Sequence, residues 1–488
     1  MRILFVASEG LPFSKTGGLA DVVEALPKAL ASMGHEVAVV LPRYRGTKAS
    51  TIVVPSLTIP MGERLRFPAV ADGTLLAGVR YYFVDDPAYF DREQLYGEKG
   101  KDYPDNAERF GEFSRAAIEI AKHVWPPDVI HCHDWQTALV RVLLRSQYAA
   151  DPLLCGIPVV FTIHNMGYHG QFPPAILKQI GVPEKLFTPE GLEFFANVNL
   201  LKGGLLYSDY LTTVSRKYAQ EIQTAEYGHG LDGVVRNRAG QLRGILNGVD
   251  YSQWSPESDA FIAARYSPQD LSGKQLCKKD LLEQFKLPQD NLKRPLIGIV
   301  SRFADQKGFD LIAKQAETLM KEDLAVAALG TGEPQHEQLF RELAVRYPAR
   351  VGVKIAYDNV LAHKIEAGAD IFLMPSRYEP CGLNQIYSLR YGTVPVVRAT
   401  GGLDDTIENY DAQRGTGTGF KFEEYTGAAL AACLHRALEM YSNRKVWERI
   451  QANGMAKDFS WTASAGEYAK LYEAARKGRI ARASGTSN

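Results

Sequence analysis

The segment 371–385 contains a side chain that could bind a sugar or stabilise charge at a reacting centre. Residues 371–375 form a short apolar run bounded by turn residues, which is typical of a buried strand in a parallel sheet. Polar residues follow, among them Glu379, and a helical pattern begins near Gly382. Ligands of open α/β sheets lie beyond the carboxyl ends of the strands, so the Glu379 carboxylate is expected to face a ligand. The alternative is that Glu379 only caps the helix.

A loop with Lys15, Gly17 and Gly18 follows the first predicted strand of the chain. The strand covers residues 2–7, and the spacing of apolar residues predicts a helix over 19–33. Backbone N–H groups at such a helix N-terminus, together with the charge of Lys15, could bind an anion. The loop matches neither GxGxxG nor the P-loop pattern, and a tight turn would explain its glycines equally well.

The second half of the chain repeats this plan. A strand is predicted over residues 295–300, a loop with Arg302, Lys307 and Gly308 follows, and a helix is predicted over 309–320. The repeat predicts two Rossmann-like domains that face each other across a cleft, each with a cationic loop at a helix N-terminus. Arginine offers a planar fork of donors and lysine a point charge, and both suit phosphate. The alternative for each cation is that it is exposed to water and binds no ligand.

Several other predicted strands also end in polar residues. Asp134, His164, Asn165 and Asn247 follow strands of the N-terminal half. Residues 400–403, with the sequence TGGL, would form a further backbone site for an anion. Because the carboxyl ends of parallel strands meet at one edge of a sheet, these groups are expected to line one crevice in each half.

The aromatic-rich segment 85–105 is predicted to be an unusually long loop. It contains Tyr89, Phe90, Tyr96 and Tyr103. Long loops with exposed aromatic rings often bind ligands, and sugars stack on such rings. Tyr96 is therefore a candidate for sugar binding.

A metal site is an alternative for His131 and His133, which share one face of a predicted strand. Cys132 lies on the other face, and no third ligand with helical spacing follows. The five cysteines are scattered and contain no CxxC pair, which favours free thiols in a reducing compartment over a zinc site or a disulfide framework. No metal and no other cofactor is expected.

The size and charge of the chain limit the classes of protein to which it can belong. Its 488 residues exceed the size of a single core, so two or more domains are expected. Lys+Arg and Asp+Glu both number 56, which gives no net field for nucleic acid or an anionic membrane. The N-terminal residues predict a strand and not a signal peptide, and no apolar run is long enough to span a bilayer. We expect a cytoplasmic protein.

Domain boundaries are predicted where the apolar periodicity is lost. Residues 1–250 are expected to form the N-terminal Rossmann-like domain, and residues 251–457 a linker plus the second one. Between residues 250 and 272 the sequence gains Ser, Pro, Asp and Tyr, which is typical of a linker. Residues 458–488 are expected to contain a helix over 461–477 and a polar, disordered tail.

Seven motifs then occur in a fixed order along the chain. They are KTGGLADVV at 15–23, HDW at 133–135, TIHN at 162–165, NGVD at 247–250, SRFADQKG at 301–308, PSRYEPCGLNQ at 375–385 and TGGLDDT at 400–406. Together they resemble bacterial glycogen synthases and plant starch synthases, the retaining ADP-glucose glucosyltransferases of glycosyltransferase family 5. The resemblance runs from the first predicted strand to the last predicted helix.

The resemblance implies an α/β fold of the type-B glycosyltransferases, with two Rossmann-like domains facing a deep cleft and a C-terminal helix that crosses back to the first domain. The N-terminal domain would bind the glucan acceptor, and the C-terminal domain the nucleotide sugar. The implied reaction transfers glucose with retention from ADP-glucose to the non-reducing end of an α-1,4-glucan, such as glycogen or a maltooligosaccharide, and releases ADP. No nucleic acid or membrane partner is implied, and the oligomeric state stays open.

The resemblance also implies roles for individual residues. The implied catalytic residues are Glu379, His164, Arg302 and Lys307. Nucleotide-sugar binding is implied for Lys15, Gly17, Gly18, Arg302, Lys307, Tyr357, Cys381, Gly382, Leu383, Thr400, Gly402 and Leu403. Contacts to the donor glucose or the acceptor are implied for Asp21, Tyr96, Asp134, Asn165 and Asn247. Tyr357 would stack on adenine, and the Gly402 and Leu403 amides would contact phosphate.

The sequence leaves three chemical questions open. Many related retaining enzymes carry a second Glu eight residues after the first, whereas here that position is Tyr387. Retention could proceed through a covalent intermediate or by same-face attack, and the sequence favours neither. Cys381 could be a nucleophile, but a lone thiol without a neighbouring base is more often structural.

Three other functions compete with this interpretation. One is a type-B transferase that uses a UDP-sugar, or a sucrose-type or phosphorylase-type relative. Another is a catalytically silent scaffold that binds glucan. The third is a nicotinamide dehydrogenase, which the missing GxGxxG disfavours.

Overall fold

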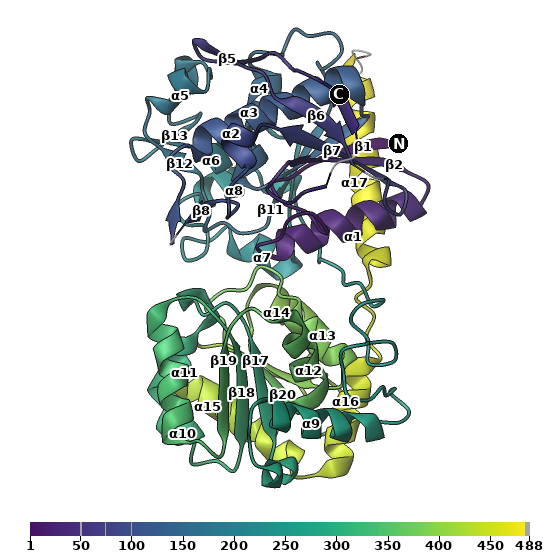
Figure 1. The fold of residues 1–488 in the computed structure, drawn as a ribbon, viewed down its shortest axis with the longest axis vertical. Coiled ribbons are helices and arrows are strands. Elements are labelled where there is room, and N and C mark those ends of the chain that lie inside the picture. Colours follow the sequence, from purple (N-terminus) through teal and green to yellow (C-terminus); the bar gives the residue numbers. More distant parts are fainter. Residues whose placement is uncertain (49–50, 74, 99, 484–488) are drawn as a thin grey trace. The chain divides into compact units, whose positions relative to one another are not determined.

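The protein divides into two compact units in the computed structural model, which describes residues 1–48, 51–73, 75–98 and 100–483 (Figure 1). One unit contains Met1–Gly248 together with Trp461–Asn488, and the other contains Val249–Ser460. The chain therefore passes between the units twice, each time a few residues from a boundary that the sequence predicts. Each unit has its own sheet and its own apolar core.

The N-terminal unit is built on one large sheet with the strand order β16-β15-β11-β10-β1-β2-β7-β6-β3. The run from β16 to β7 is parallel, and β6 and β3 extend it antiparallel. The strands are β1 (Arg2–Val6), β2 (Glu36–Pro42), β3 (Thr51–Val54), β6 (Ala69–Asp72), β7 (Val79–Asp85), β10 (Val129–His133), β11 (Val159–Ile163), β15 (Tyr210–Thr213) and β16 (Leu242–Gly244). The central strands are continuous buried apolar runs because helices cover both faces of a parallel sheet.

Short helices and three small ladders complete this unit. The helices are α1 (Gly18–Ser32), α2 (Pro87–Phe90), α3 (Asn106–Glu119, continued by a π turn at Ile120–Val124), α4 (Leu139–Arg145), α5 (Ile176–Gln179), α6 (Leu200–Tyr207), α7 (Arg216–Glu221), α8 (Asp232–Asn237) and α17 (Trp461–Ala483). The ladders are β4 (Ile59–Met61) with β5 (Arg64–Arg66), β8 (Gly97–Glu98) with β9 (Lys101–Asp102), and β12 (Gln171–Phe172) with β14 (Asn197–Asn199) and β13 (Glu193–Phe194). The predicted long loop over 85–105 is therefore wrong in part, since it contains α2 and the β8–β9 hairpin.

The C-terminal unit is a parallel, doubly wound sheet with the order β19-β18-β17-β20-β21-β22. Its strands are β17 (Leu296–Val300), β18 (Ala325–Gly330), β19 (Val351–Ile355), β20 (Ile371–Met374), β21 (Val394–Arg398) and β22 (Phe420–Phe422). Its helices are α9 (Ser272–Gln284), α10 (Phe309–Leu319), α11 (Pro334–Arg346), α12 (Asn359–Gly368), α13 (Asn384–Arg390), α14 (Gly401–Thr406), α15 (Gly427–Tyr441) and α16 (Arg444–Met455). One core contains residues of α10, α11 and α15, and another contains residues of α9 and α12.

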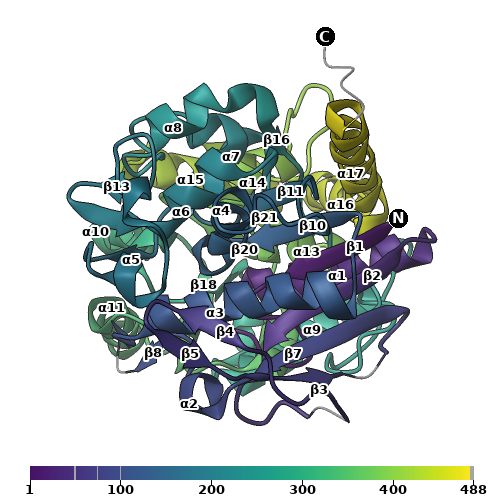
Figure 2. The ribbon, with the colours of Figure 1, turned by 90° about the horizontal axis from the view of Figure 1, so that it is seen from above.

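The C-terminal helix α17 packs into the core of the N-terminal unit. It lies beside α1 in both ribbon views (Figures 1 and 2). Tyr468, Leu471 and Tyr472 are buried on one face of the helix, as the sequence predicts. The helix continues to Ala483, so the predicted tail is helical over 478–483, and residues 484–488 lie outside the described part of the chain. None of the described helices is both long and apolar enough to cross a membrane.

Replacing Gly248 by alanine is expected to destabilise the N-terminal unit by about 1–3 kcal/mol, the usual cost of overpacking. A Cβ on Gly248 would lie 2.6 Å from the Cα of Trp461, the first residue of α17, and backbone cannot move aside cheaply. Gly466→Ala is the matched control, because a Cβ there meets nothing within 4 Å and alanine favours a helix interior by about 1 kcal/mol. Calorimetric unfolding checks both variants. Equal melting temperatures for Gly248→Ala and wild type would contradict this packing.

Candidate active site

The carboxyl ends of β17 and β20 bring Lys307 and Glu379 together in the C-terminal unit. These strands are neighbours in the sheet. The Lys307 Nζ donates to Glu379 Oε2 at 2.6 Å, and the Ser376 hydroxyl donates to the same oxygen at 3.0 Å. Glu379 is buried, and the helix α13 that follows begins without a side-chain cap. The alternative that Glu379 only caps a helix is therefore wrong, because its carboxylate is bonded to Lys307 and Ser376.

Glycines allow the loops around this pair to touch backbone to backbone. Gly308 has φ +75°, and a Cβ there would lie 2.0 Å from the carbonyl oxygen of Pro375. Gly401 has φ +46°, and its Cβ would lie 1.9 Å from the carbonyl oxygen of Glu379. Left-handed backbone and this lack of space both require glycine. The loop that carries Glu379 is thus fixed between the loop after β17 and the start of α14.

The amides of Gly402 and Leu403 are engaged with backbone carbonyl groups. The Gly402 N–H donates to the carbonyl oxygens of Glu379 and Pro380 at 3.0 and 3.2 Å, and the Leu403 N–H donates to that of Thr400 at 3.0 Å. The sequence interpretation has both amides contacting phosphate. In this structure they brace the Glu379 loop instead, so the expectation that they are available to a ligand is wrong here.

The other predicted nucleotide-sugar residues of this unit lie along the same edge of the sheet. Arg302 is exposed directly after β17, and Tyr357 follows β19 with 79% of its surface exposed. Cys381 is buried, Gly382 has φ +69°, and Leu383 precedes the first residue of α13. Thr400 is buried at the start of α14. Their roles toward a ligand stay predictions.

Tyr387, which stands where related enzymes carry a second carboxylate, belongs to an aromatic stack. Its ring lies parallel to that of Trp254 at 4.1 Å, and Trp254 stacks in turn on His363 at 3.6 Å. Tyr387 is only 6% exposed. The position therefore supplies packing in this chain.

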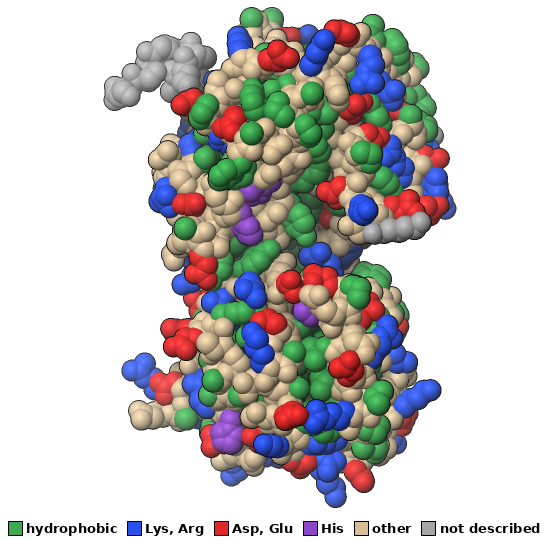
Figure 3. Space-filling model, turned by 90° about the vertical axis from the view of Figure 1, so that its left-hand side faces the viewer, with side chains coloured by type: hydrophobic (Ala, Val, Ile, Leu, Met, Phe, Trp, Pro, Cys, Tyr) green, Lys and Arg blue, Asp and Glu red, His purple; other side chains and the backbone are tan. Residues whose placement is uncertain are grey.

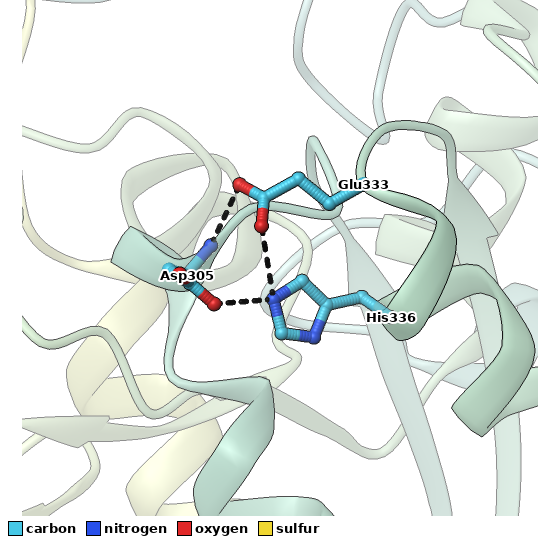
Figure 4. Close-up of side chains that lie close together, drawn as sticks. All are labelled: Asp305, Glu333 and His336. Atoms are coloured by element: carbon cyan, nitrogen blue, oxygen red, sulfur yellow. Dashed lines mark hydrogen bonds and ion pairs between the residues drawn. The ribbon is translucent and has the colours of Figure 1, made fainter.

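A group of possible metal ligands, Asp305, Glu333 and His336, lies beside the Lys307 loop (Figure 4). His336 Nε2 lies 2.9 Å from Asp305 Oδ1 and 3.7 Å from Glu333 Oε2, and the Asp305 N–H donates to the Glu333 carboxylate at 3.2 Å. Sequence reasoning missed this group because Asp305 is far in sequence from Glu333 and His336, which lie at the start of α11. The contacts tie the loop after β17 to the start of α11. The expectation that this protein needs no metal remains a prediction.

In the N-terminal unit, a buried glutamate that sequence reasoning missed organises the lysine-bearing loop. Glu9 is 2% exposed and accepts hydrogen bonds from the Thr16 N–H and hydroxyl, both at 2.7 Å, and from the Gly17 N–H at 3.2 Å. Burial raises the pKa of Glu9, while these bonds oppose the shift. The Gly17 amide is thus used inside the protein, and the expectation that it binds phosphate is wrong in this structure. The sequence signal that could have identified Glu9 is a polar residue shortly after a buried strand.

Lys15 and Asp21 form an ion pair at the start of α1. The Lys15 Nζ lies 2.6 Å from Asp21 Oδ1, and Gly18 is the first residue of the helix. Burial raises the pKa of Asp21, and the neighbouring Lys15 counteracts that effect. The structure therefore brings together Lys15, which is predicted to bind phosphate, and Asp21, which is predicted to bind sugar, and the two side chains bond each other.

Three histidines, two on β10 and one directly after β11, form a row of polar side chains. His131 has both ring nitrogens engaged, Nδ1 with the Tyr472 hydroxyl at 2.7 Å and Nε2 with the Thr162 hydroxyl at 2.6 Å. The metal alternative for His131 and His133 is therefore wrong. His133 Nδ1 lies 3.0 Å from His164 Nε2. Burial lowers the pKa of His164 to about 3, so this ring is neutral at physiological pH.

Asp134 lies beside His164 with strained backbone. Its φ of 54° and ψ of −177° are almost confined to glycine and cost about 1–3 kcal/mol, and such strain concentrates at functional sites. The Asp134 carboxylate accepts the His164 N–H at 2.7 Å. Burial raises the pKa of Asp134 to about 7. A carboxyl group of this kind can either donate or accept a hydrogen bond near neutral pH.

The other residues that are predicted to bind sugar differ in their burial and in their contacts. The Tyr96 hydroxyl lies 2.8 Å from the Ser8 hydroxyl at the end of β1, and the Tyr96 ring packs on Phe110. Tyr89 and Phe90 of the same segment are buried, so the interpretation of their rings as exposed is wrong. Asn165 accepts the N–H of Gly167 at 2.8 Å. Asn247 is buried, and its Oδ1 has no hydrogen-bond partner among the described residues.

Known proteins match this chain over nearly its whole length. The family described as the starch synthase catalytic domain matches residues 2–237, and glycosyl transferases group 1 matches residues 282–453. The glycogen synthase of Koribacter versatilis is 57% identical over 481 residues, covering 98% of this chain and 99% of its own. Glycogen synthase 1 of Geobacter metallireducens is 47% identical and covers 98% and 97%. The chain belongs to the glycogen synthase and starch synthase family.

The solved structures agree with this family membership. The catalytic domain of starch synthase IV from Arabidopsis thaliana, bound to ADP and acarbose, matches with a TM-score of 0.89 and 34% identity over 97% of this chain and 99% of its own. Sucrose-phosphate synthase from Thermosynechococcus elongatus, at 19% identity and a TM-score of 0.61, shares the fold. The predicted family, the type-B glycosyltransferase fold and the glycosyltransferase activity are confirmed. The protein is an enzyme of the glycogen synthase type.

We expect His164 to carry its proton on Nδ1 and to stay neutral between about pH 5.5 and 8. His133 Nε2 is buried without a partner among the described residues. Burying an N–H group without an acceptor costs more free energy than burying a nitrogen lone pair without a donor. The His133 proton is therefore expected on Nδ1, which donates it to His164 Nε2. Long-range ¹H–¹⁵N spectra of histidine-labelled protein report the tautomer directly.

His133→Phe keeps the ring stacking on Phe5 but removes the donor, so it is expected to release His164 into a mixture of tautomers. His133→Asn, which retains an N–H donor near Nδ1, is the matched control. A protonated His164 Nε2 in the wild type, or an unchanged tautomer in His133→Phe, would contradict the assignment.

Proposed function

We propose that the enzyme transfers glucose from ADP-glucose, with retention, to the non-reducing end of an α-1,4-glucan such as glycogen or a maltooligosaccharide, and that it releases ADP. The observation that carries the proposal is the Lys307–Glu379 pair at the carboxyl ends of adjacent strands. The Arabidopsis relative bound to ADP and acarbose supports a nucleotide and an oligosaccharide as ligand classes. The C-terminal unit would bind the nucleotide sugar, and the N-terminal unit the glucan.

Stabilising negative charge on the departing diphosphate is the main chemical task. Breaking the bond between glucose and phosphate moves charge onto the leaving group while the sugar becomes oxocarbenium-like. Arg302 would supply a fork of donors and Lys307 a point charge, and each well-placed donor contributes about 3 kcal/mol in such sites. Glu379 already holds the Lys307 side chain in place, so this side chain loses no further conformational entropy when the ligand binds.

Glu379 would bind the sugar and stabilise its charge without attacking it. One of its oxygens already accepts from Lys307 and Ser376. A carboxylate with this pairing is a weak nucleophile, which favours same-face attack over a covalent intermediate on Glu379. Neutral His164 would offer a hydrogen-bonding group to glucose hydroxyls, because burial lowers its pKa, and Asp134 could either donate to or accept from them, because burial raises its pKa to about 7.

The proposal includes no metal, no other cofactor, no nucleic acid and no membrane partner. Lys, Arg and backbone amides can stabilise a diphosphate without an ion. Basic and acidic side chains are interspersed on the face drawn in Figure 3, and the net charge of the chain is zero. None of the five cysteines, all of which lie in the described part of the chain, forms a disulfide, which suits a reducing compartment such as the cytoplasm.

The test is release of ADP from ADP-glucose, measured with and without added maltooligosaccharide and in the presence of EDTA. We expect rapid release only with the acceptor, unchanged by EDTA, and much slower turnover of UDP-glucose. Arg302→Ala should lose 10²–10³-fold in kcat, the usual cost of one donor. Lys314→Ala is the control, since this exposed lysine of α10 pairs only with Asp310 within the described part of the chain. Glucan binding without ADP release would instead indicate a silent scaffold, and faster turnover of UDP-glucose a different donor.

A further inference from the structure

An open hollow of about 790 Å³ lies in the N-terminal unit, away from the candidate active-site residues. It lies where β15 and β16 begin, between the end of α4, the turn from α6 to β15 and the segment from α8 to β16. The candidate active-site residues of this unit follow the carboxyl ends of β1, β10 and β11, and all these strands are parallel. The hollow is therefore at the opposite edge of the sheet. Its volume is in the range of small-molecule sites.

Three guanidinium groups line the hollow, and two of them have no carboxylate partner. Arg238 donates to the carbonyl oxygen of Ser208 at 2.6 Å and to that of Leu206. Arg243 donates to the carbonyl oxygens of Gly240 and Leu242 at 3.0 and 2.8 Å. Neither forms an ion pair with any acidic residue that the structure describes. Carbonyl oxygens fix the orientation of these cations but leave their full charge in place.

The third guanidinium, that of Arg145, shares its only carboxylate among the described residues. Asp209 lies 3.2 Å from Arg145 and 2.7 Å from the buried Arg141. One carboxylate thus faces four guanidinium groups in and beneath the hollow, although the chain as a whole has no net charge. Guanidinium groups that are held in place and form no ion pair of their own suit the binding of phosphate.

We propose that this hollow binds a small molecule that carries a phosphate group, with Arg238 and Arg243 holding the phosphate. Tyr207 and Tyr210 also line the hollow and offer ring faces for the rest of the ligand. A neutral sugar would suit the tyrosines equally, but it would leave the two cations without a counter-charge. The positive charge therefore favours the anion over a glucan chain.

Arg243 allows a test that does not disturb folding. It is exposed, and its hydrogen bonds reach only residues of its own turn, whereas Arg238 joins two separate segments. Arg243→Gln is the test variant. Arg236→Gln is the matched control, because this neighbouring arginine lies on α8, is compensated by Asp232 at 2.6 Å and does not line the hollow.

The experiment is a calorimetric titration with pyrophosphate at constant ionic strength, in a background of Lys15→Ala, Arg302→Ala and Lys307→Ala that removes the lysine and arginine side chains predicted to bind phosphate at the proposed active site. We expect binding to persist in this background, to persist with Arg236→Gln added, and to weaken about tenfold with Arg243→Gln added. In otherwise wild-type enzyme, Arg243→Gln should leave ADP release unchanged, so failure here is separable from failure of the proposed function.

Three results would overturn the proposal. Pyrophosphate could fail to bind the background variant at millimolar concentration, which would place anion binding at the active site alone. Binding could be equal in the Arg243→Gln and Arg236→Gln proteins. Maltooligosaccharide binding could fall in Arg243→Gln while pyrophosphate binding does not, which would assign the hollow to a carbohydrate.

Discussion

A lysine held 2.6 Å from a buried glutamate is the interaction on which the C-terminal unit's site depends. The two side chains come from segments that follow adjacent parallel strands, so the pair exists only when the sheet is correctly formed. Glycines at 308 and 401 let the surrounding loops approach closely enough to bury the glutamate. A buried carboxylate is costly without a partner, and the lysine offsets that cost while its own position is fixed. The same contact thus stabilises the loop and prepares a cation for phosphate.

The N-terminal unit also has a lysine that an ion pair with a carboxylate holds in place. Lys15 is held by Asp21 of the helix that follows it, also at 2.6 Å, and Glu9 fixes the loop that carries Lys15 through the next residue, Thr16. Buried polar groups continue along this edge of the sheet through Asp134 to His164. Burial keeps these histidines neutral, so the N-terminal unit contributes hydrogen bonds more than charge. In the proposed function, the C-terminal unit would supply most of the positive charge for a diphosphate, and the N-terminal unit would supply hydrogen bonds for sugar hydroxyls.

Much of this organisation could be predicted because it follows from strand ends and glycine positions. The βα units and the cationic loops need only local patterns and the rule that ligands lie at carboxyl ends. The pairing of charges could not be predicted. Each half has an aspartate early in the helix after its cationic loop, yet Lys15 pairs with that aspartate, Asp21, whereas Lys307 pairs with Glu379. The matching Asp310 bonds Tyr425 and Lys314 instead. Partners from distant segments, such as Tyr472 for His131, are set by packing that no local pattern reports.

The central claim is that Lys307 and Glu379 act as one unit, and a double-mutant cycle tests it most directly. The measured quantity is kcat/KM for ADP-glucose in Lys307→Ala, Glu379→Ala and the combined protein. Residues that act as a unit are strongly non-additive. The account predicts that each single change costs about 10²–10³-fold and that the combined change costs little more than the worse of the two. Losses that multiply, with no coupling between the positions, would contradict it.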